Sequence, residues 1–347
     1  MQLDSRFIQA LYRQNKGPTP IWLMRQAGRY LPEYRQVRAQ AGDFWTLCKT
    51  PELACEVTLQ PLRRYDLDAA IVFSDILTIP DAIGFDLIFE EKKGPVFSKT
   101  FRHESDLKSL KLEDAMSRLA YVFSTVALCR QHMPAHLPLI GFAGSPWTLA
   151  CYMIEGQGSR DFNEVFHLLY QAPALMRQLL SILRDLVAEY LIEQVNHGAN
   201  ALMLFDTWGG ILPSESYQQL NLCDFAYIVK RVQQVHPNIP LVIFGKNNGF
   251  YLEELAATGC QGVGIDWTVD MAKAKALVGH KVCLQGNLHP QVLKQAPKVI
   301  QQAATQILDA YGAGEGHVFN LGHGITPDVP PEAVHVLIET IHHYQKK

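Results

Sequence analysis

LPLIGFAG, residues 137–144, is an uncharged run that stops at Ser145. It shows no alternation of polar and apolar residues, so a strand formed from it would be buried on both faces, as strands of parallel sheets are. Further short apolar runs end in the same way at a polar residue. They are IWLM (21–24), AAIVFS (69–74), ALMLF (201–205), LVIFG (241–245), GVGI (262–265), VCLQG (282–286) and HVFNLG (317–322).

Longer segments with helical character separate these runs. We expect helices within residues 51–65, 165–198, 217–235, 250–259, 271–279 and 290–312. Several of them close on glycine, which commonly ends helices. Eight strands alternating with helices predict a closed, parallel (β/α)8 barrel of the TIM type. An open doubly wound sheet is the competing fold, but no GxGxxG motif follows an early strand to support its dinucleotide-binding form.

One segment interrupts this alternation. Residues 83–102, IGFDLIFEEKKGPVFSKTFR, contain two extended runs around KKGP. They predict a hairpin inserted after the second strand, on the face of a barrel where active sites lie. Because no linker or repeat divides the chain, we expect residues 1–347 to form a single domain.

Composition excludes several classes of protein. The chain has 347 residues, 48% of them hydrophobic, and a formal charge of −3, so nothing in its overall charge favours binding to nucleic acid or to an anionic membrane. No apolar run approaches the roughly 18 residues of a membrane-spanning helix. The seven cysteines form no CxxC motif, which predicts reduced, mostly buried thiols and a cytoplasmic location.

Polar residues at the carboxyl ends of the predicted strands are the first candidates for a site, because functional side chains of such barrels gather there. Those residues are Arg25, Asp75, Ser145, Asp206, Thr207, Lys246, Asp266, Asn287 and His323. A polar residue that ends a strand usually caps a helix or a turn instead. We favour that structural interpretation for Ser145, Asp266 and Asn287.

The stretch after the first run is unusually cationic. Arg25, Arg29 and Arg35 lie within eleven positions of one another. Neighbouring guanidinium groups repel unless an anion joins them, and they match carboxylates and phosphates in bidentate geometry. The stretch therefore predicts an anion-binding site, and the alternative is a surface arginine pair neutralised by Glu33 and other acids.

A second motif, GFAGSPWTLACYMIEG (141–156), begins with a glycine-rich turn that could approach a ligand. Trp147, Tyr152 and Met153 then offer either an apolar surface with a phenol or ordinary core packing. A metal site at His280, Cys283 and Cys260 is disfavoured, because no carboxylate or second histidine lies at a useful spacing. The residues alone thus predict a barrel enzyme for a polyanionic, partly apolar small molecule, without choosing the reaction.

Both motifs resemble signature stretches of the uroporphyrinogen decarboxylase family. PIWLMRQAGRYLPEYR (20–35) and GFAGSPWTLACYMIEG carry the resemblance. Shorter segments agree in order and spacing, namely FSDIL (73–77), FDTWGG (205–210), FGK (244–246), QGN (285–287) and NLGHGI (320–325). The resemblance implies a single-domain barrel, a homodimer and no cofactor. It also implies removal of carbon dioxide from the four acetate arms of uroporphyrinogen III, which gives coproporphyrinogen III.

The resemblance also implies roles for residues. Arg25 and Arg29 would hold some of the eight substrate carboxylates, and Asp75 would face the pyrrole N–H groups beneath the macrocycle. Tyr152, Thr207 and His323 would line the same cleft, with Thr207 standing where some members carry serine. Asp75, Arg25 and Tyr152 are the residues expected to take part in catalysis.

Two other functions are compatible with a barrel of this kind, namely methyl transfer and tetrapyrrole binding without catalysis. Cobalamin-linked methyltransferases share this barrel and hold zinc through a His-x-Cys pair, but this sequence contains no His-x-Cys. A non-catalytic tetrapyrrole carrier would not need a carboxylate under the ring, so the presence of Asp75 favours the enzyme.

Overall fold

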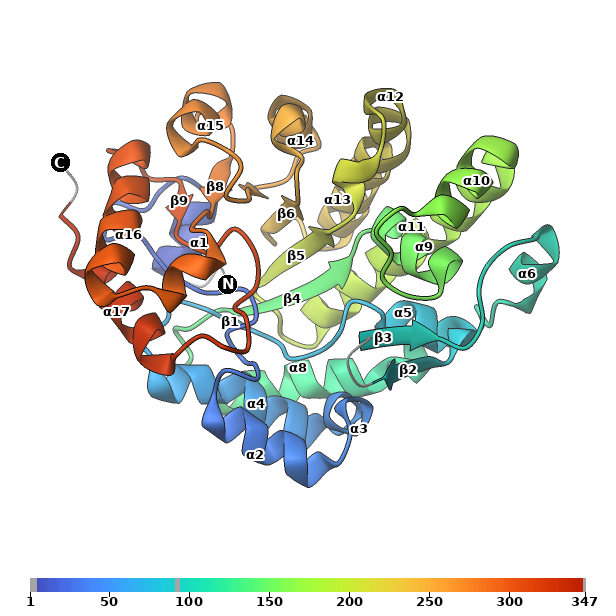
Figure 1. The fold of residues 1–347 in the computed structure, drawn as a ribbon, viewed down its shortest axis with the longest axis horizontal. Coiled ribbons are helices and arrows are strands. Elements are labelled where there is room, and N and C mark those ends of the chain that lie inside the picture. Colours follow the sequence, from blue (N-terminus) through green and yellow to red (C-terminus); the bar gives the residue numbers. More distant parts are fainter. Residues whose placement is uncertain (1–4, 91–93, 346–347) are drawn as a thin grey trace.

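The computed structural model describes residues 5–90 and 94–345. Its main sheet is parallel, with the strand order β1-β4-β5-β6-β7-β8-β9, and helices surround it (Figure 1). The strands are β1 (Ala70–Ile71), β4 (Leu139–Gly144), β5 (Ala201–Asp206), β6 (Leu241–Gly245), β7 (Gly262–Gly264), β8 (Cys283–Gln285) and β9 (His317–Val318). Each of these strands overlaps a predicted apolar run, and β1 and β9 cover only two residues of theirs.

The first apolar run closes the barrel without forming a regular strand. Ile21 makes a single parallel bridge with Phe319. The Phe319 N–H donates to the Pro20 carbonyl at 2.8 Å, and the Asp68 N–H donates to the Ile21 carbonyl at 2.9 Å. Residues 20 and 21 thus span the gap between β9 and the approach to β1. The predicted barrel is confirmed, but a full strand over residues 21–24 is wrong.

Side chains explain why this run is irregular. The backbone N–H groups of Ile21, Leu23 and Met24 donate to the buried side-chain oxygens of Asp68, Gln26 and Asn320 at 2.8, 3.1 and 3.0 Å. Buried backbone donors must find a partner, and here three of them find side chains in place of the neighbouring strand. The chain is therefore free to turn at Arg25.

The helices follow the strands as the barrel alternation requires. They are α1 (Arg6–Leu11), α2 (Pro32–Ala41), α3 (Phe44–Lys49), α4 (Pro51–Arg64), α5 (Thr78–Pro80), α6 (Glu104–Ser109), α7 (Ala115–Arg118), α8 (Ala120–His132), α9 (Pro146–Glu155), α10 (Asn163–Gln171), α11 (Pro173–Asn196), α12 (Ser214–Ser216), α13 (Cys223–Val235), α14 (Leu252–Ala257), α15 (Met271–Val278), α16 (Pro297–Tyr311) and α17 (Pro331–His342). Short 3-10 and π turns are η1 (Asp81–Phe85), η2 (Gly209–Ile211), η3 (Tyr217–Leu222), η4 (Gly249–Tyr251) and η5 (Pro290–Lys294).

Two predicted helices are divided before a proline. The helix expected within residues 290–312 forms η5 and α16, and α16 begins at Pro297. Residues 165–198 form two helices, α10 and α11, that are separated by Ala172. Pro173 has no N–H to continue the first helix, and it disfavours helical geometry at the residue before it. Glycine ends helices as predicted at Gly198, Gly259 and Gly312, which have positive φ angles. No helix among the described residues is long and apolar enough to cross a membrane.

The predicted hairpin is present as β2 (Leu87–Glu90) and β3 (Gly94–Phe97), which pair antiparallel. Residues 91–93 of its turn lie outside the described part of the chain, and residues 83–85 belong to η1 and are not extended. The hairpin rests on the end of the second motif, because the Phe97 N–H donates to the Gly156 carbonyl at 2.7 Å. It therefore lies beside the carboxyl end of α9.

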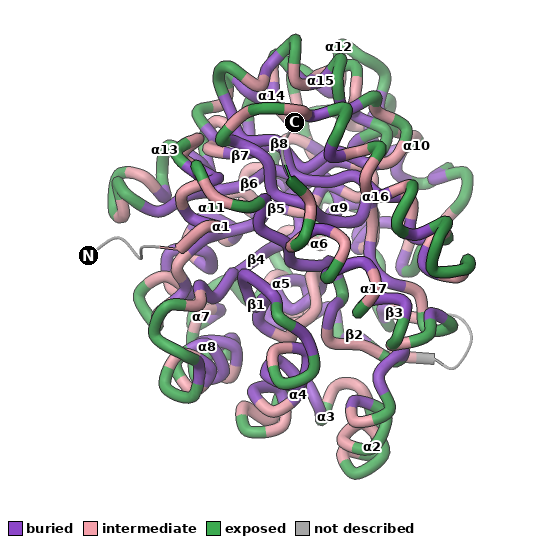
Figure 2. Tube along the Cα trace, turned by 90° about the vertical axis from the view of Figure 1, so that its left-hand side faces the viewer, coloured by how far each residue is buried: buried purple, intermediate pink, exposed green. Residues whose placement is uncertain are grey.

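The strands lie at the centre of the molecule, and Figure 2 shows that exposure is concentrated on the outer helices and loops. Every residue of β4 and β6 is buried, as expected for strands covered on both faces. All seven cysteines are free thiols and only Cys223 is exposed, which confirms the predicted reduced and mostly buried set. That residues 1–347 form a single domain stays a prediction.

Candidate active site

The polar residues that end the strands meet at one edge of the barrel. Thr207 and Lys246 directly follow β5 and β6, and His323 follows β9. Asp75 lies four positions after β1, and Arg25 follows the bridge at Ile21. Because parallel strands bring their carboxyl ends together, these side chains come from distant parts of the chain to the same face.

Arg25 is the candidate residue whose charge acts on several of the other candidate residues. Its φ of 61° is uncommon for a residue with a side chain, and such conformations concentrate at functional sites. Its stem lies across Gly324, where an added Cβ would collide with the Arg25 Cδ. Glycine at 324 thus makes room for the arginine. Burial raises the pKa of Asp75 and of Tyr152 and lowers that of His323. The charge of Arg25 opposes the first two shifts and adds to the third, which places all three residues within its electrostatic reach.

Asp75 is a half-buried carboxylate in a turn after β1. Its Oδ1 accepts a hydrogen bond from the Leu77 N–H at 2.8 Å, which fixes the direction of the side chain. Burial raises its pKa, and the Leu77 N–H and Arg25 oppose that rise. The carboxylate is therefore held in place by one donor and has capacity to accept further hydrogen bonds.

Tyr152 lies on α9, the helix that follows β4. Its ring packs near that of Trp208, with centroids 6.2 Å apart, and Trp208 packs in turn on Phe162 at 4.9 Å. Burial raises the pKa of Tyr152, with the indole of Trp208 opposing and Asp75 adding to the rise. The hydroxyl is thus a neutral donor close to the Asp75 carboxylate. Trp147 and Met153 of the same motif are buried in the core, so only Tyr152 of these three serves the site.

His323 is neutral in this environment. Its pKa is lowered to about 4 by burial and by the charges of Arg25 and Lys246, with Asp266 acting in the opposite direction. Its ring lies 6.2 Å from that of Phe244. A neutral imidazole has one donor and one acceptor nitrogen, so it can donate to a carboxylate without adding charge.

This shift gives a prediction for the titration of His323. We expect nuclear magnetic resonance of the ligand-free protein to show a midpoint near 4, with the His323→Gln variant used to assign the signal. Between about pH 6.5 and pH 4 the unfolded chain takes up a proton that the folded protein does not, so His323 lowers the stability as pH falls through that window. A midpoint at or above 6 would contradict the electrostatic environment described here.

A buried network holds the loop that carries Thr207. The carboxylate of Asp206 accepts from the hydroxyls of Ser145 and Thr148 at 2.6 and 3.1 Å and from the Asn221 amide at 2.9 Å. Desolvation raises its pKa to about 6, against these donors. The Thr148 hydroxyl also accepts from the Trp208 N–H at 3.2 Å. The network therefore joins β5 to the start of α9 and orients both Thr207 and the helix of Tyr152.

Arg29 is separate from this group. The side chains of Arg25 and Arg29 are both exposed, but Arg29 acts on the pKa of Tyr34, which burial raises and which Arg38 and Arg29 lower. Within residues 5–90 and 94–345, neither Arg25 nor Arg29 forms an ion pair. Glu33 forms a bidentate pair with Arg64 at 2.7 and 3.0 Å, so the alternative that Glu33 neutralises the two arginines is wrong.

The structural interpretation is confirmed for three strand-end residues. Ser145 caps α9 by accepting from the Thr148 N–H, and Asp266 accepts from the Thr268 N–H at 2.8 Å. Asn287 donates to the carbonyls of Asp266 and Val269. Trp208 and Lys246 had no assigned role in the sequence, although both stand at the ends of neighbouring strands, which is the signal that marks them.

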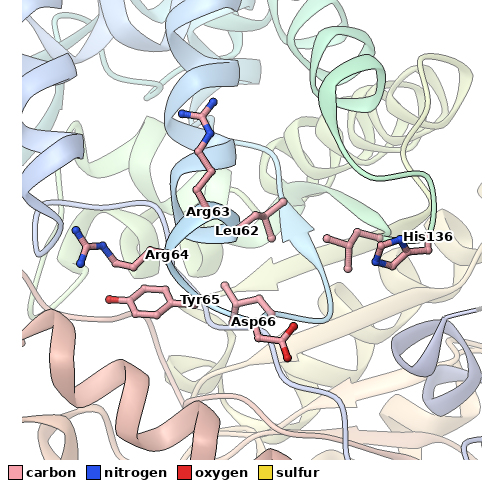
Figure 3. Close-up of a pocket in the computed structure, with 8 residues that line it drawn as sticks. Leu62, Arg63, Arg64, Tyr65, Asp66 and His136 are labelled. Atoms are coloured by element: carbon pink, nitrogen blue, oxygen red, sulfur yellow. The ribbon is translucent and has the colours of Figure 1, made fainter.

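A depression of about 370 Å³ lies at the opposite end of the barrel, lined by Leu62, Arg63, Arg64, Tyr65, Asp66, Leu67, His136 and Leu137 (Figure 3). These residues precede β1 and β4. Arg63 pairs with Glu56 at 2.8 and 2.9 Å, and Arg64 pairs with Glu33. Its arginines are therefore already neutralised. In the described part of the chain, no group of three or more His, Cys, Asp or Glu side chains could hold a metal ion.

The fold and the site define a β/α-barrel enzyme in which a carboxylate, a tyrosine and a neutral histidine lie within electrostatic reach of an arginine that forms no ion pair with the described residues. The sequence profile of uroporphyrinogen decarboxylase matches residues 2–344, and the chain belongs to that family.

Individual relatives agree with this assignment. The chain is 54% identical to uroporphyrinogen decarboxylase of Legionella pneumophila (strain Corby), over 98% of this chain and 96% of that one. It is 53% identical to the enzyme of the same name from Nitrosococcus oceani, again over 98% and 96%. Among solved structures, a methyltransferase from Methanosarcina mazei superimposes with a TM-score of 0.82, covering 98% of each chain at 20% identity. At that identity the likeness concerns the fold alone.

Proposed function

We propose that this protein decarboxylates the four acetate side chains of uroporphyrinogen III to give coproporphyrinogen III, a reaction of haem biosynthesis. Membership of the family supports the reaction. The grouping of Asp75 with Arg25, Tyr152 and His323 at the carboxyl end of the barrel supports the site, and it is the observation on which the mechanism depends.

The chemistry requires an electron sink. Protonation of a pyrrole carbon makes the ring a cationic iminium, and the electrons of the breaking C–C bond then flow into it as carbon dioxide leaves. A second proton is then added to the exocyclic carbon and completes the methyl group. The proton first placed on the ring carbon leaves, which restores the neutral pyrrole, so that each decarboxylation consumes one proton in total. Asp75 would stabilise the cationic ring through its fixed negative charge near the pyrrole N–H groups, as preorganised electrostatics does in other sites.

The remaining residues would bind and orient the substrate. Arg25 and Arg29 each offer a guanidinium for a carboxylate, at about 1.5–3 kcal/mol for each charge-assisted hydrogen bond. Tyr152, Thr207 and His323 would donate neutral hydrogen bonds. The proton donor is Asp75, an arginine or a bound water. We also infer a cytosolic homodimer of a single-domain chain, on the resemblance and on the free thiols.

An anaerobic assay tests this function. Purified protein, supplied with reduced uroporphyrinogen III and an excess of chelator, should yield products with seven, six, five and finally four carboxylates, resolved by chromatography after oxidation. No loss of carboxylates from folded protein would refute the proposal. Loss of activity on chelation with recovery on adding zinc would instead favour a methyltransferase-like metal enzyme, which the absence of a His-x-Cys pair opposes.

A further inference from the structure

Lys246 is a half-buried lysine that directly follows β6 and has no assigned role. Its N–H donates to the Asp206 carbonyl at 3.3 Å, so its backbone is held beside the end of β5. Its Nζ lies 6.0 Å from the centre of the Trp208 ring, the ring that also contacts Tyr152. The side chain therefore extends over the loop of Thr207 and Trp208, inside the group of candidate site residues.

The same ammonium group is close to the other side of the site. Its charge, with that of Arg25, disfavours protonation of His323, so Lys246 and Arg25 both lie near that imidazole. The Arg25 side chain lies against Gly324, the residue after His323, whereas Lys246 follows β6, whose Phe244 ring has its centre 6.2 Å from that of the imidazole. Two cations thus approach one neutral donor from different elements.

The acids on the neighbouring strands do not neutralise Lys246. Asp206 at the end of β5 uses its oxygens for Ser145, Thr148 and Asn221. Asp266 after β7 accepts from the N–H groups of Asn247 and Thr268 at 2.6 and 2.8 Å, and from the Thr268 hydroxyl. Among residues 5–90 and 94–345, Lys246 has no ion pair.

A partly desolvated ammonium next to a guanidinium is unfavourable unless an anion lies between them. Lys246 and Arg25 are charged hydrogen-bond donors, and the neutral His323 is an uncharged one. Together these three side chains can bind one carboxylate. We propose that Lys246, together with Arg25 and His323, binds one side-chain carboxylate of the substrate. This inference rests on the proposed function, because it concerns the polycarboxylate that the enzyme would decarboxylate.

Three variants test the role of Lys246. Lys246→Met keeps the length of the side chain and removes the charge, and Lys246→Arg keeps the charge. Lys298→Met is the matched control, because Lys298 is exposed on α16 at the outside of the barrel. Binding of uroporphyrin, which has eight carboxylates and is not decarboxylated, is measured by fluorescence, and turnover of uroporphyrinogen is measured anaerobically.

We expect Lys246→Met to weaken uroporphyrin binding and to raise KM by about tenfold, the scale of one charge-assisted contact. Lys246→Arg should recover most of that loss, and Lys298→Met should match the wild type. Affinity should also fall less steeply with ionic strength in Lys246→Met than in the wild type, because one fewer cation meets the ligand. A side chain that only supports the loop would change the melting temperature and kcat without changing this salt dependence.

The outcomes separate this inference from the function on which it rests. If the wild type neither binds uroporphyrin nor converts uroporphyrinogen, the proposed function and the role of Lys246 both fail. If the wild type is active and Lys246→Met keeps its affinity, KM and salt dependence within twofold, only the role of Lys246 is refuted. A loss in Lys246→Met that Lys246→Arg fails to restore, with an unchanged salt dependence, would also refute it.

Discussion

The Asp75→Asn variant should keep its fold and its affinity for uroporphyrin, and it should lose about a hundredfold to a thousandfold in kcat, which is what the removal of one preorganised electrostatic stabiliser costs. Asparagine retains an oxygen that can accept the 2.8 Å hydrogen bond from Leu77, so the turn after β1 should survive. The charge is what disappears. Binding in the ground state depends on cations such as Arg25, which remain, whereas the cationic ring depends on the missing carboxylate.

The alternative is that Asp75 only holds its turn. In that case Asp75→Asn would be nearly silent, because asparagine is as good an acceptor in turns and caps as aspartate. Asp270→Asn is the matched control, since Asp270 caps α15 by accepting from the Lys273 N–H at 2.8 Å and is exposed. Steady-state kinetics decide between the accounts: an Asp75→Asn enzyme within threefold of the wild type would remove Asp75 from the mechanism.

Much of the fold was predictable because buried parallel strands appear in a sequence as short, continuous apolar runs. Runs such as 137–144 and 241–245 are apolar on both faces because helices cover one face and the barrel interior covers the other. The irregular backbone of residues 21–24 could not be predicted from the residue types in that run. Its Met24 N–H bonds to Asn320, 296 positions away, and no local pattern reveals such a partner.

The candidate site was predictable only in part. The rule that functional residues follow the strands located Arg25, Asp75, Thr207 and His323, and the fold then brought Arg25, Asp75 and His323 within electrostatic reach. The same rule gave no means of ranking Lys246 against Asp206 or Asp266. That distinction depends on which oxygens are already hydrogen-bonded, and the bonding follows from three-dimensional contacts such as that between Ser145 and Asp206.

Arg25→Ala should lower kcat/KM by roughly thirtyfold to a thousandfold or more. The Arg25 side chain is exposed in the free protein, but a bound carboxylate would cover it, and truncating one partner of a charge pair that is desolvated in the complex costs about 2–5 kcal/mol. The melting temperature should change little, because within the described residues Arg25 has no ion pair to lose. Arg29→Ala is the paired variant. It removes an equal charge from a side chain that is also exposed but acts on Tyr34 in place of Asp75, and it should raise KM by about tenfold, the scale of one charge-assisted contact.

The pH dependence of the two arginine variants distinguishes a shared electrostatic site from two independent anchors. Arg25 lowers the pKa of Asp75, so its removal should raise that pKa. In its electrostatic role Asp75 acts as the ionised carboxylate, and the acidic limb of kcat/KM should therefore move to higher pH in Arg25→Ala. Arg29 does not act on Asp75, so Arg29→Ala should keep the wild-type limb. If both variants raised KM and neither moved the limb, Arg25 would be a binding residue only, and the coupling between its guanidinium and the Asp75 carboxylate would have no part in the reaction.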